Sequence, residues 1–292
     1  MAEVYELKTR IEGLKSIHNI TYAMQIVTIS RLKRIISGLA RITDATDEVS
    51  SALRYLVTEN EVFYNRLVQP EFEGTHDVLV LLFSNRGFCG SYNQDILNAG
   101  LALCKEKGLD FNTVPKICLG KKAKDVLKRY SLSNVTFETS EKDIFNEIES
   151  RGVYETVQSH VKSGARVHLV YFGFKSIVTQ KVVVEEFFPP SRDEFPPYSK
   201  LKLSVPHFVE QSPSFTFETL FQQYYYLKML KVIRSAASSE FSQRFLLMKS
   251  AVDNVKSLSE ELLIELNKER QAGITQEVSE IISTFKALSK ER

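Results

Sequence analysis

The chain has 292 residues, of which 43% are hydrophobic and 25% charged, with a formal net charge of +2 at pH 7. These values predict one or two globular domains with a substantial core. The balanced charge argues against a nucleic-acid-binding protein, and no apolar run approaches the ~18 residues that a membrane-spanning helix requires.

The first segment is predicted to be a long helix. All eight prolines lie between Pro70 and Pro213, and proline interrupts helices, so both ends of the chain can be helical. From Leu7 through Ile11 and Leu14 to Leu56, apolar residues recur at steps of three and four, as in a helix with one apolar stripe. We therefore assign residues 1–69 to an N-terminal coiled-coil helix.

Residues 70–213 are predicted to form an α/β domain. The run DVLVLLFS at 77–84 is typical of a buried parallel strand, and a glycine-containing loop follows it. Strands alternating with helices favour a mostly parallel, Rossmann-like sheet. Further strands are expected at 116–120, 134–138, 166–174 and 180–188, and helices at 93–107 and 121–129.

The last segment, residues 214–292, repeats the helical periodicity, for example at Phe241, Phe245, Met248 and Val252. One continuous helix here would be ~120 Å long at ~1.5 Å per residue, and a helix of that length needs a partner. The N-terminal segment is the natural partner, and it would run antiparallel because the chain returns between the two. The expected fold is thus a Rossmann-like α/β domain inserted between the two helices of a long antiparallel coiled coil.

The loop NRGFCGSYN at 85–93 is a candidate nucleotide site. It lies where a Rossmann domain binds phosphate, but Gly87 and Gly90 do not form GxGxxG. The next strand ends in Gly120 and two lysines rather than an acidic ribose ligand, and this GKK is not a Walker A loop. A tight structural turn is therefore favoured over a Rossmann-type nucleotide-binding enzyme, which remains the less favoured alternative.

Catalytic and metal-binding patterns are not found in the sequence. The five histidines are scattered without HExxH or neighbouring cysteine ligands, and no Ser/His/Asp grouping follows from spacing. We therefore expect no catalytic residue, no cofactor and no metal in this chain.

A group of basic residues lies in the N-terminal helix, where no acid occurs between Glu12 and Asp44. One interpretation is a solvated helix face, and the other is an electrostatic contact with an acidic partner surface. We call this group the basic collar; it consists of Lys15, Arg31, Lys33, Arg34 and Arg41.

The compartment is indicated by the N-terminus and the cysteines. MAEVYELKTRIEGLK contains acids from its third residue and no long apolar stretch, so we expect neither a secretion signal nor a mitochondrial transit peptide. Cys89, Cys104 and Cys118 form no CxxC pair, which favours free thiols in a reducing compartment. We expect the chain in the cytoplasm or on the inner face of a membrane.

Four stretches, in order along nearly the whole chain, resemble ATP synthase gamma subunits. SIHNITYAMQIVTISRLKR at 16–34 is similar to their IT-x-AM-x-x-V helix with its basic cluster, and SNRGFCGSYN at 84–93 is similar to SDRGLCGGxN. SSEFSQRFLLM at 238–248 resembles SE-x-x-x-RM-x-AM. The most specific stretch is NKERQAGITQEVSEII at 267–282, which resembles N-x-x-RQA-x-IT-x-E-x-x-EI.

The resemblance implies the central rotor shaft of an F-type ATP synthase. Members of the family thread their coiled coil through a ring of three alpha and three beta subunits, and their α/β domain meets an epsilon subunit and the c-ring. Because the shaft lacks threefold symmetry, its rotation changes the nucleotide affinity of each beta subunit in turn, while the chemistry stays in the beta subunits. This implies a peripheral protein on the cytoplasmic face of the bacterial plasma membrane, touching the membrane only through the c-ring.

Motif positions imply two sets of residues. The glycine loop would be structural, through Arg86, Gly87, Cys89, Gly90 and Asn93. For Met24, a place in the coiled-coil core is an equally favoured interpretation. Contacts with beta subunits are implied for Met24, Arg31, Lys33, Arg34, Arg244, Arg270, Gln271 and Thr275.

The sequence departs from the family pattern in three places. Asn85 replaces an Asp, Phe245 replaces a Met, and Ser-Thr-Phe at 283–285 stands where small residues usually occur. These changes indicate a divergent member. They leave open a gamma-like stalk of a specialised ATPase that drives motility or export.

Overall fold

The computed structural model describes residues 2–59, 76–130, 132–140, 144–190 and 213–290. The chain divides into two compact units, one of residues Ile29–Arg244 and one of Met1–Thr28 with Phe245–Arg292. Two long helices contribute to both units. These are α1 (Ala2–Glu59) and α6 (Pro213–Lys290).

Helix α6 confirms the prediction of one continuous helix from about Ser214, because its 78 residues contain proline only at the first position. Helix α1 has 58 residues, and the rest of its predicted range, 60–69, lies outside the described residues. Threonine hydroxyls within α1 donate to carbonyls four residues earlier, as Thr28 does to Met24 at 2.6 Å. Buried hydroxyls are thereby satisfied inside the helix.

Within the larger unit, α1 and α6 pack side by side in opposite directions. Leu32 and Ile35 of α1 form a buried cluster with Phe241 of α6. Further along α1, Asp47 lies 4.0 Å from Lys231 of α6. Residue numbers rise on one helix as they fall on the other, so the pair is antiparallel.

The larger unit contains a five-stranded sheet in the order β3-β2-β1-β4-β5. All neighbouring strands are parallel except β4 and β5, which pair antiparallel. The predicted mostly parallel sheet is therefore confirmed. The strands are β1 (His76–Leu82), β2 (Lys116–Leu119), β3 (Val135–Glu138), β4 (Ala165–Phe174) and β5 (Gln180–Phe188).

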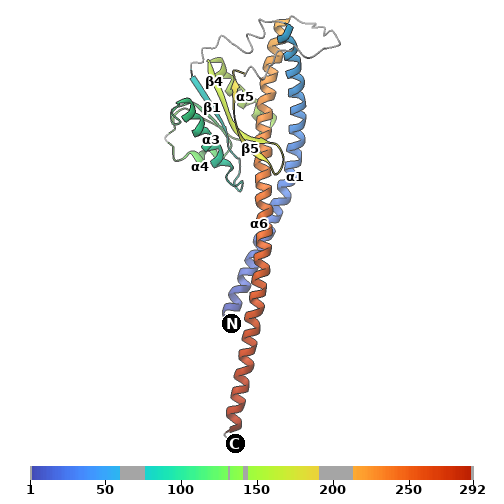
Figure 1. The fold of residues 1–292 in the computed structure, drawn as a ribbon, viewed down its shortest axis with the longest axis vertical. Helices are drawn as coiled ribbons and strands as arrows, with labels where there is room; N and C mark the ends of the chain where they lie inside the picture. The colour runs from blue at the N-terminus through green and yellow to red at the C-terminus, as the bar shows by residue number, and fades with distance from the viewer. Residues whose placement is uncertain (1, 60–75, 131, 141–143, 191–212, 291–292) are drawn as a thin grey trace. The chain divides into compact units, whose positions relative to one another are not determined.

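Helices cover both faces of this sheet (Figure 1). Because side chains alternate along a strand, β1 sends Val78 and Val80 to one face and Leu79 and Leu81 to the other. The first pair packs in a core with residues of α1, α6 and α5 (Glu147–Lys162). The second pair packs with residues of α3 (Tyr92–Lys107) and α4 (Ala123–Leu127).

Helix α5 was not predicted from the sequence. Its signal was present as a capping box, in which the side chain of Asn146 accepts from Glu149 N–H and the Glu149 carboxylate accepts from Asn146 N–H. Glycine at 152 and Ser and Thr nearby lower the helical propensity of the segment and conceal it.

Within the described residues, none of the helices combines the length and the apolar character needed to cross a bilayer.

Candidate functional site

The glycine loop, residues 84–91, begins where the central strand β1 ends and leads into α3. Phe88 and Gly90 both have positive φ, at 59° and 61°. Glycine adopts this conformation at little cost, whereas a bulky residue such as Phe88 adopts it rarely. The surrounding contacts must therefore hold the loop in its turn, as the prediction of a tight structural turn requires.

The two ends of the loop are joined by Ser84 and Asn93. Ser84 N–H donates to Asn93 Oδ1 at 2.9 Å, and Asn93 Nδ2 donates to Ser84 Oγ at 2.8 Å. Ser84 Oγ in turn donates to the carbonyl of Arg86 at 2.8 Å. The Cys89 thiol donates to the same serine at 3.6 Å, and burial raises its pKa. Cys89 and Asn93 thus both bond to Ser84 within the loop region, and the structural role implied by their motif position stays a prediction.

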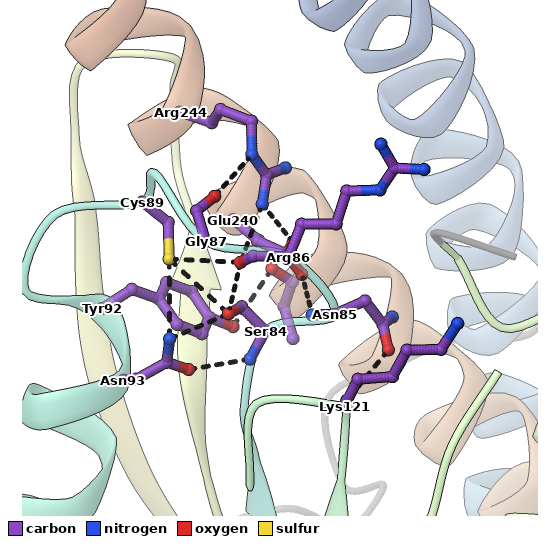
Figure 2. Close-up of polar contacts among 11 residues, drawn as sticks. Ser84, Asn85, Arg86, Gly87, Cys89, Tyr92, Asn93, Lys121, Glu240 and Arg244 are labelled. Atoms are coloured by element: carbon purple, nitrogen blue, oxygen red, sulfur yellow. Dashed lines mark hydrogen bonds and ion pairs between the residues drawn. The ribbon is translucent and has the colours of Figure 1, made fainter. Parts of the chain in front are cut away.

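Two charged residues of α6 reach into the loop (Figure 2). Arg244 donates from Nε to the carbonyl of Gly87 at 3.1 Å and from Nη2 to the carbonyl of Arg86 at 3.2 Å. Glu240 accepts from Asn85 N–H at 3.2 Å. The two α6 side chains pair at 2.6 Å, between Arg244 Nη2 and Glu240 Oε1. Both backbone N–H and backbone carbonyl groups of the loop are therefore bonded to side chains of α6.

This ion pair is inside the protein, since Glu240 and Arg244 are each only 4% exposed. Burial raises the pKa of Glu240, and the opposing effects of the Arg244 guanidinium and of the backbone N–H groups of Asn85 and Arg86 are smaller. The pair is costly to bury, so each partner depends on the other for a compensating charge.

The backbone just after strand β2 lies close to the backbone just after strand β1. At Gly120, where φ is +97°, an added Cβ would stand 2.3 Å from the carbonyl oxygen of Phe83 and 2.9 Å from that of Ser84. Lys121 N–H donates to Asn85 Oδ1 at 3.3 Å. The backbone of the turn after β2 therefore contacts the edge where a Rossmann domain would bind phosphate.

The surroundings of this edge offer little free space beside Glu240 and, among the described residues, no metal-type cluster of side chains. The cavity next to Glu240 has a volume of about 20 Å³, enough for one water molecule. In the part of the chain that the structure describes, no three His, Cys, Asp or Glu side chains are grouped to hold a metal ion. The arrangement fastens the glycine loop to helix α6.

The residues predicted to contact beta subunits differ in how exposed they are. Arg31, Lys33 and Arg34 are exposed on α1, whereas Met24 is partly buried. Arg270, Gln271 and Thr275 are exposed on α6, and Thr275 Oγ1 donates to the Gln271 carbonyl at 2.9 Å. Of the eight residues predicted to contact beta subunits, Arg244 is the one that the structure places with the loop; any contact of these residues with a partner stays a prediction.

Glu240 was missed by the sequence reasoning, although its motif was recognised. The spacing of four residues between Glu240 and Arg244 on a predicted helix was a usable signal for an ion pair. The sequence could not show that the same pair faces a loop 155 residues earlier in the chain.

The chain is similar to known proteins in family, sequence and fold. A family model described as ATP synthase matches residues 3–288. The ATP synthase gamma chain of Chloroherpeton thalassium is 28% identical, with 99% of both chains covered. That of Cytophaga hutchinsonii is 27% identical, with 99% of this chain and 100% of the relative covered.

Solved structures with a similar fold come from ATP synthases. A chain of the Euglena gracilis mitochondrial ATP synthase, from an OSCP/F1/c-ring structure, matches with a TM-score of 0.63 at 16% identity, covering 98% of this chain and 95% of that one. A chain of the Tetrahymena thermophila central stalk and c-ring structure matches with a TM-score of 0.57 at 19% identity, covering 80% and 99%. The match over nearly the whole length, with gamma chains as the similar curated proteins, shows that this chain belongs to the ATP synthase family as a relative of its gamma chains.

Proposed function

We propose that this chain, as the central rotor shaft of an F-type ATP synthase, couples rotation and ion flow at a membrane ring to ATP synthesis or hydrolysis. The family match over residues 3–288, on a chain with two long helices and one sheet, is the observation that carries this function. Chemistry takes place in the beta subunits of an alpha/beta hexamer, and this chain supplies no catalytic group and binds no cofactor.

The division of labour follows the three segments 1–69, 70–213 and 214–292. The outer segments form an antiparallel coiled coil, and the middle segment forms a Rossmann-like domain. One α1 and one α6 have no threefold symmetry, so such a shaft presents a different surface to each of three beta subunits. Each rotation step favours a different nucleotide-bound state in each subunit, which is a shift of populations by differential contact.

Contacts with beta subunits are proposed at exposed polar positions on both helices. Arg31, Lys33 and Arg34 suit acidic surfaces, and Arg270 with Gln271 offers a charged fork beside an amide that both donates and accepts. Thr275 extends this group and Met24 contributes an apolar contact. Arg244 belongs to the set by motif position, and because its guanidinium is buried we propose that it acts through the glycine loop.

The middle domain is proposed to meet the epsilon subunit and the c-ring. Such a chain is a peripheral protein on the cytoplasmic face of a bacterial plasma membrane, present once per three alpha and three beta subunits. Its link to the membrane is then indirect, through the ring.

The test is purification of the tagged chain from its native cells, identification of its partners, and an ATPase assay. Recovery of alpha-like and beta-like subunits at about three copies each per chain, with ring subunits, is the expected result. Motility or export proteins in place of the ring would indicate a specialised ATPase. Recovery of the chain without ATPase subunits would overturn the proposal, and tight binding of NAD or ATP by the lone chain would redirect it to nucleotide chemistry.

A further inference from the structure

Five residues of α6 make polar contacts with the sheet layer and the glycine loop, all within the unit Ile29–Arg244. At ~100° per residue, their steps of one, three, one and four spread them over about half of the helix circumference. We call this set the polar seam. It consists of Ser235, Ala236, Ser239, Glu240 and Arg244.

Ser235 and Ser239 of the seam contact strand β4, which pairs antiparallel with β5. Phe174 N–H donates to Ser235 Oγ at 2.8 Å, and Ser239 Oγ donates to the Phe172 carbonyl at 3.1 Å. The donor and the acceptor on the sheet side both belong to β4. Ser239 is fully buried, so its hydroxyl makes this bond away from water.

The rest of the seam contacts α3 and the glycine loop. Tyr92 Oη donates to the carbonyl of Ala236 at 3.3 Å, and Tyr92 is 1% exposed. Glu240 and Arg244 hold the loop as described above. Helix α6 is thus bonded to strand β4 and to the continuous segment formed by the glycine loop and the start of α3.

The seam differs in kind from the apolar contacts beside it. The core cluster that joins α6 to the sheet contains Met229, Val232 and Ile233, and apolar burial carries little directional preference. Hydrogen bonds depend on direction. Since successive residues of a helix are ~100° apart, rotation of α6 by one position would break every bond of the seam together.

Stability alone is a weak explanation for the seam. A buried ion pair such as Glu240 with Arg244 contributes little net stability compared with apolar residues of the same size, because desolvation offsets the attraction. In some proteins a buried ionic or polar group instead selects one packing arrangement among several similar apolar ones. One rotational position of α6 about its own axis, relative to the sheet domain, is such an arrangement; we call this position its angular register.

We propose that the polar seam sets the angular register of α6 against the sheet domain and holds it under torque, which makes its members positioning residues for rotary coupling. The inference rests on the proposed function. In a shaft that lacks threefold symmetry, the rotational position of the sheet domain has meaning for the catalytic sites only if α6 cannot turn against that domain. Helix α6 is a single helix from Pro213 to Lys290.

The experiment uses the assembled complex reconstituted in vesicles, with ATP hydrolysis and ATP-driven ion transport measured on the same sample. A potential-sensitive dye reports transport of any cation. One seam variant combines Ser235→Ala with Ser239→Ala, and the other is Tyr92→Phe, which removes the hydrogen bond to the Ala236 carbonyl of the seam. The matched control is Ser238→Ala with Ser242→Ala, because both serines are buried on the same helix and Ser238 bonds within it, to the Arg234 carbonyl.

Loss of the two serine hydrogen bonds should raise the population of slipped registers roughly tenfold or more. We therefore expect the ratio of transport to hydrolysis to fall below that of the wild type in the seam variants under a large opposing potential, with hydrolysis retained and the control unchanged. A general folding defect would lower hydrolysis and assembly together and leave the ratio alone.

Seam variants that assemble and transport ions at the wild-type ratio would overturn the inference while leaving the shaft function intact. If one variant does not assemble, the other decides. Failure of the wild-type chain to assemble with alpha and beta subunits would instead defeat the proposed function.

Discussion

Two stretches of α6 differ in what surrounds them. In residues 235–244 every side chain is buried or partly buried, and Ser235, Ser239 and Arg244 bond to the sheet domain. In residues 270–283 every residue is exposed, including Ile274, Val278 and Ile281. Both stretches carry arginine, but Arg244 is satisfied inside the chain whereas Arg270 faces solvent.

This difference separates contacts that the chain makes with itself from surfaces that only a partner can cover. Several exposed apolar side chains close together on one helix indicate an interaction site or an aggregation liability. Variants in the first stretch should therefore change the stability of the isolated chain, and variants in the second should change function only after assembly.

The largest expected effect is that of Glu240→Ala. It leaves the Arg244 guanidinium buried without its carboxylate, which should destabilise the chain by about 3–5 kcal/mol. Urea denaturation of the purified chain measures the change. Glu6→Ala is the control, because Glu6 pairs with Arg10 at 3.8 Å on an exposed helix face and should be nearly neutral. Equal losses in both variants would contradict the importance of burial.

Next in size is Gly120→Ala. A Cβ at this position meets the Phe83 carbonyl oxygen at 2.3 Å in a backbone conformation with φ of +97°, so we expect a loss of about 2–3 kcal/mol. Gly152→Ala is the matched opposite, since nothing lies within 4 Å of an added Cβ in helix α5. It should stabilise the chain by about 0.5–1 kcal/mol. Thermal unfolding of both variants distinguishes the two signs.

A smaller effect concerns pH. The pKa of Glu240 is raised in the folded chain above its ordinary value of 4.5, so protonated Glu240 favours the native state. That contribution is complete below the unfolded-state pKa and is lost as pH rises through the folded-state pKa. The stability of the wild type relative to Glu240→Gln should therefore fall as pH increases from about 4.5. The test is to measure the unfolding free energies of the two proteins at several pH values from about 4 to about 7. A difference between them that stayed constant or increased with pH would refute this prediction.

The smallest expected change in stability follows Arg270→Ala with Gln271→Ala. Both residues are exposed, so the unfolding free energy of the isolated chain should stay within about 0.5 kcal/mol of wild type. ATPase activity of the assembled complex should nevertheless be lost if these side chains hold beta-subunit loops. Retained activity in a correctly assembled complex would remove them from the proposed contact set.

The sequence by itself determined the elements that depend on local physics. Confinement of proline to residues 70–213 left both ends free to be helical, and the apolar run at 77–84 identified the central strand β1. The family motifs singled out Arg244 and the glycine loop as separate features. Helix α5 escaped because its capping box lies in a segment of low helical propensity.

Only the tertiary structure decided which of these features belong together. Arg244 and Gly87 are 157 positions apart, and no local pattern relates them. Their contact arises because α6 packs against the sheet at the end where β1 stops, which brings it up to two segments far apart in the sequence, strand β4 and the glycine loop with the start of α3. Periodicity specifies a face of a helix, whereas packing specifies what that face meets.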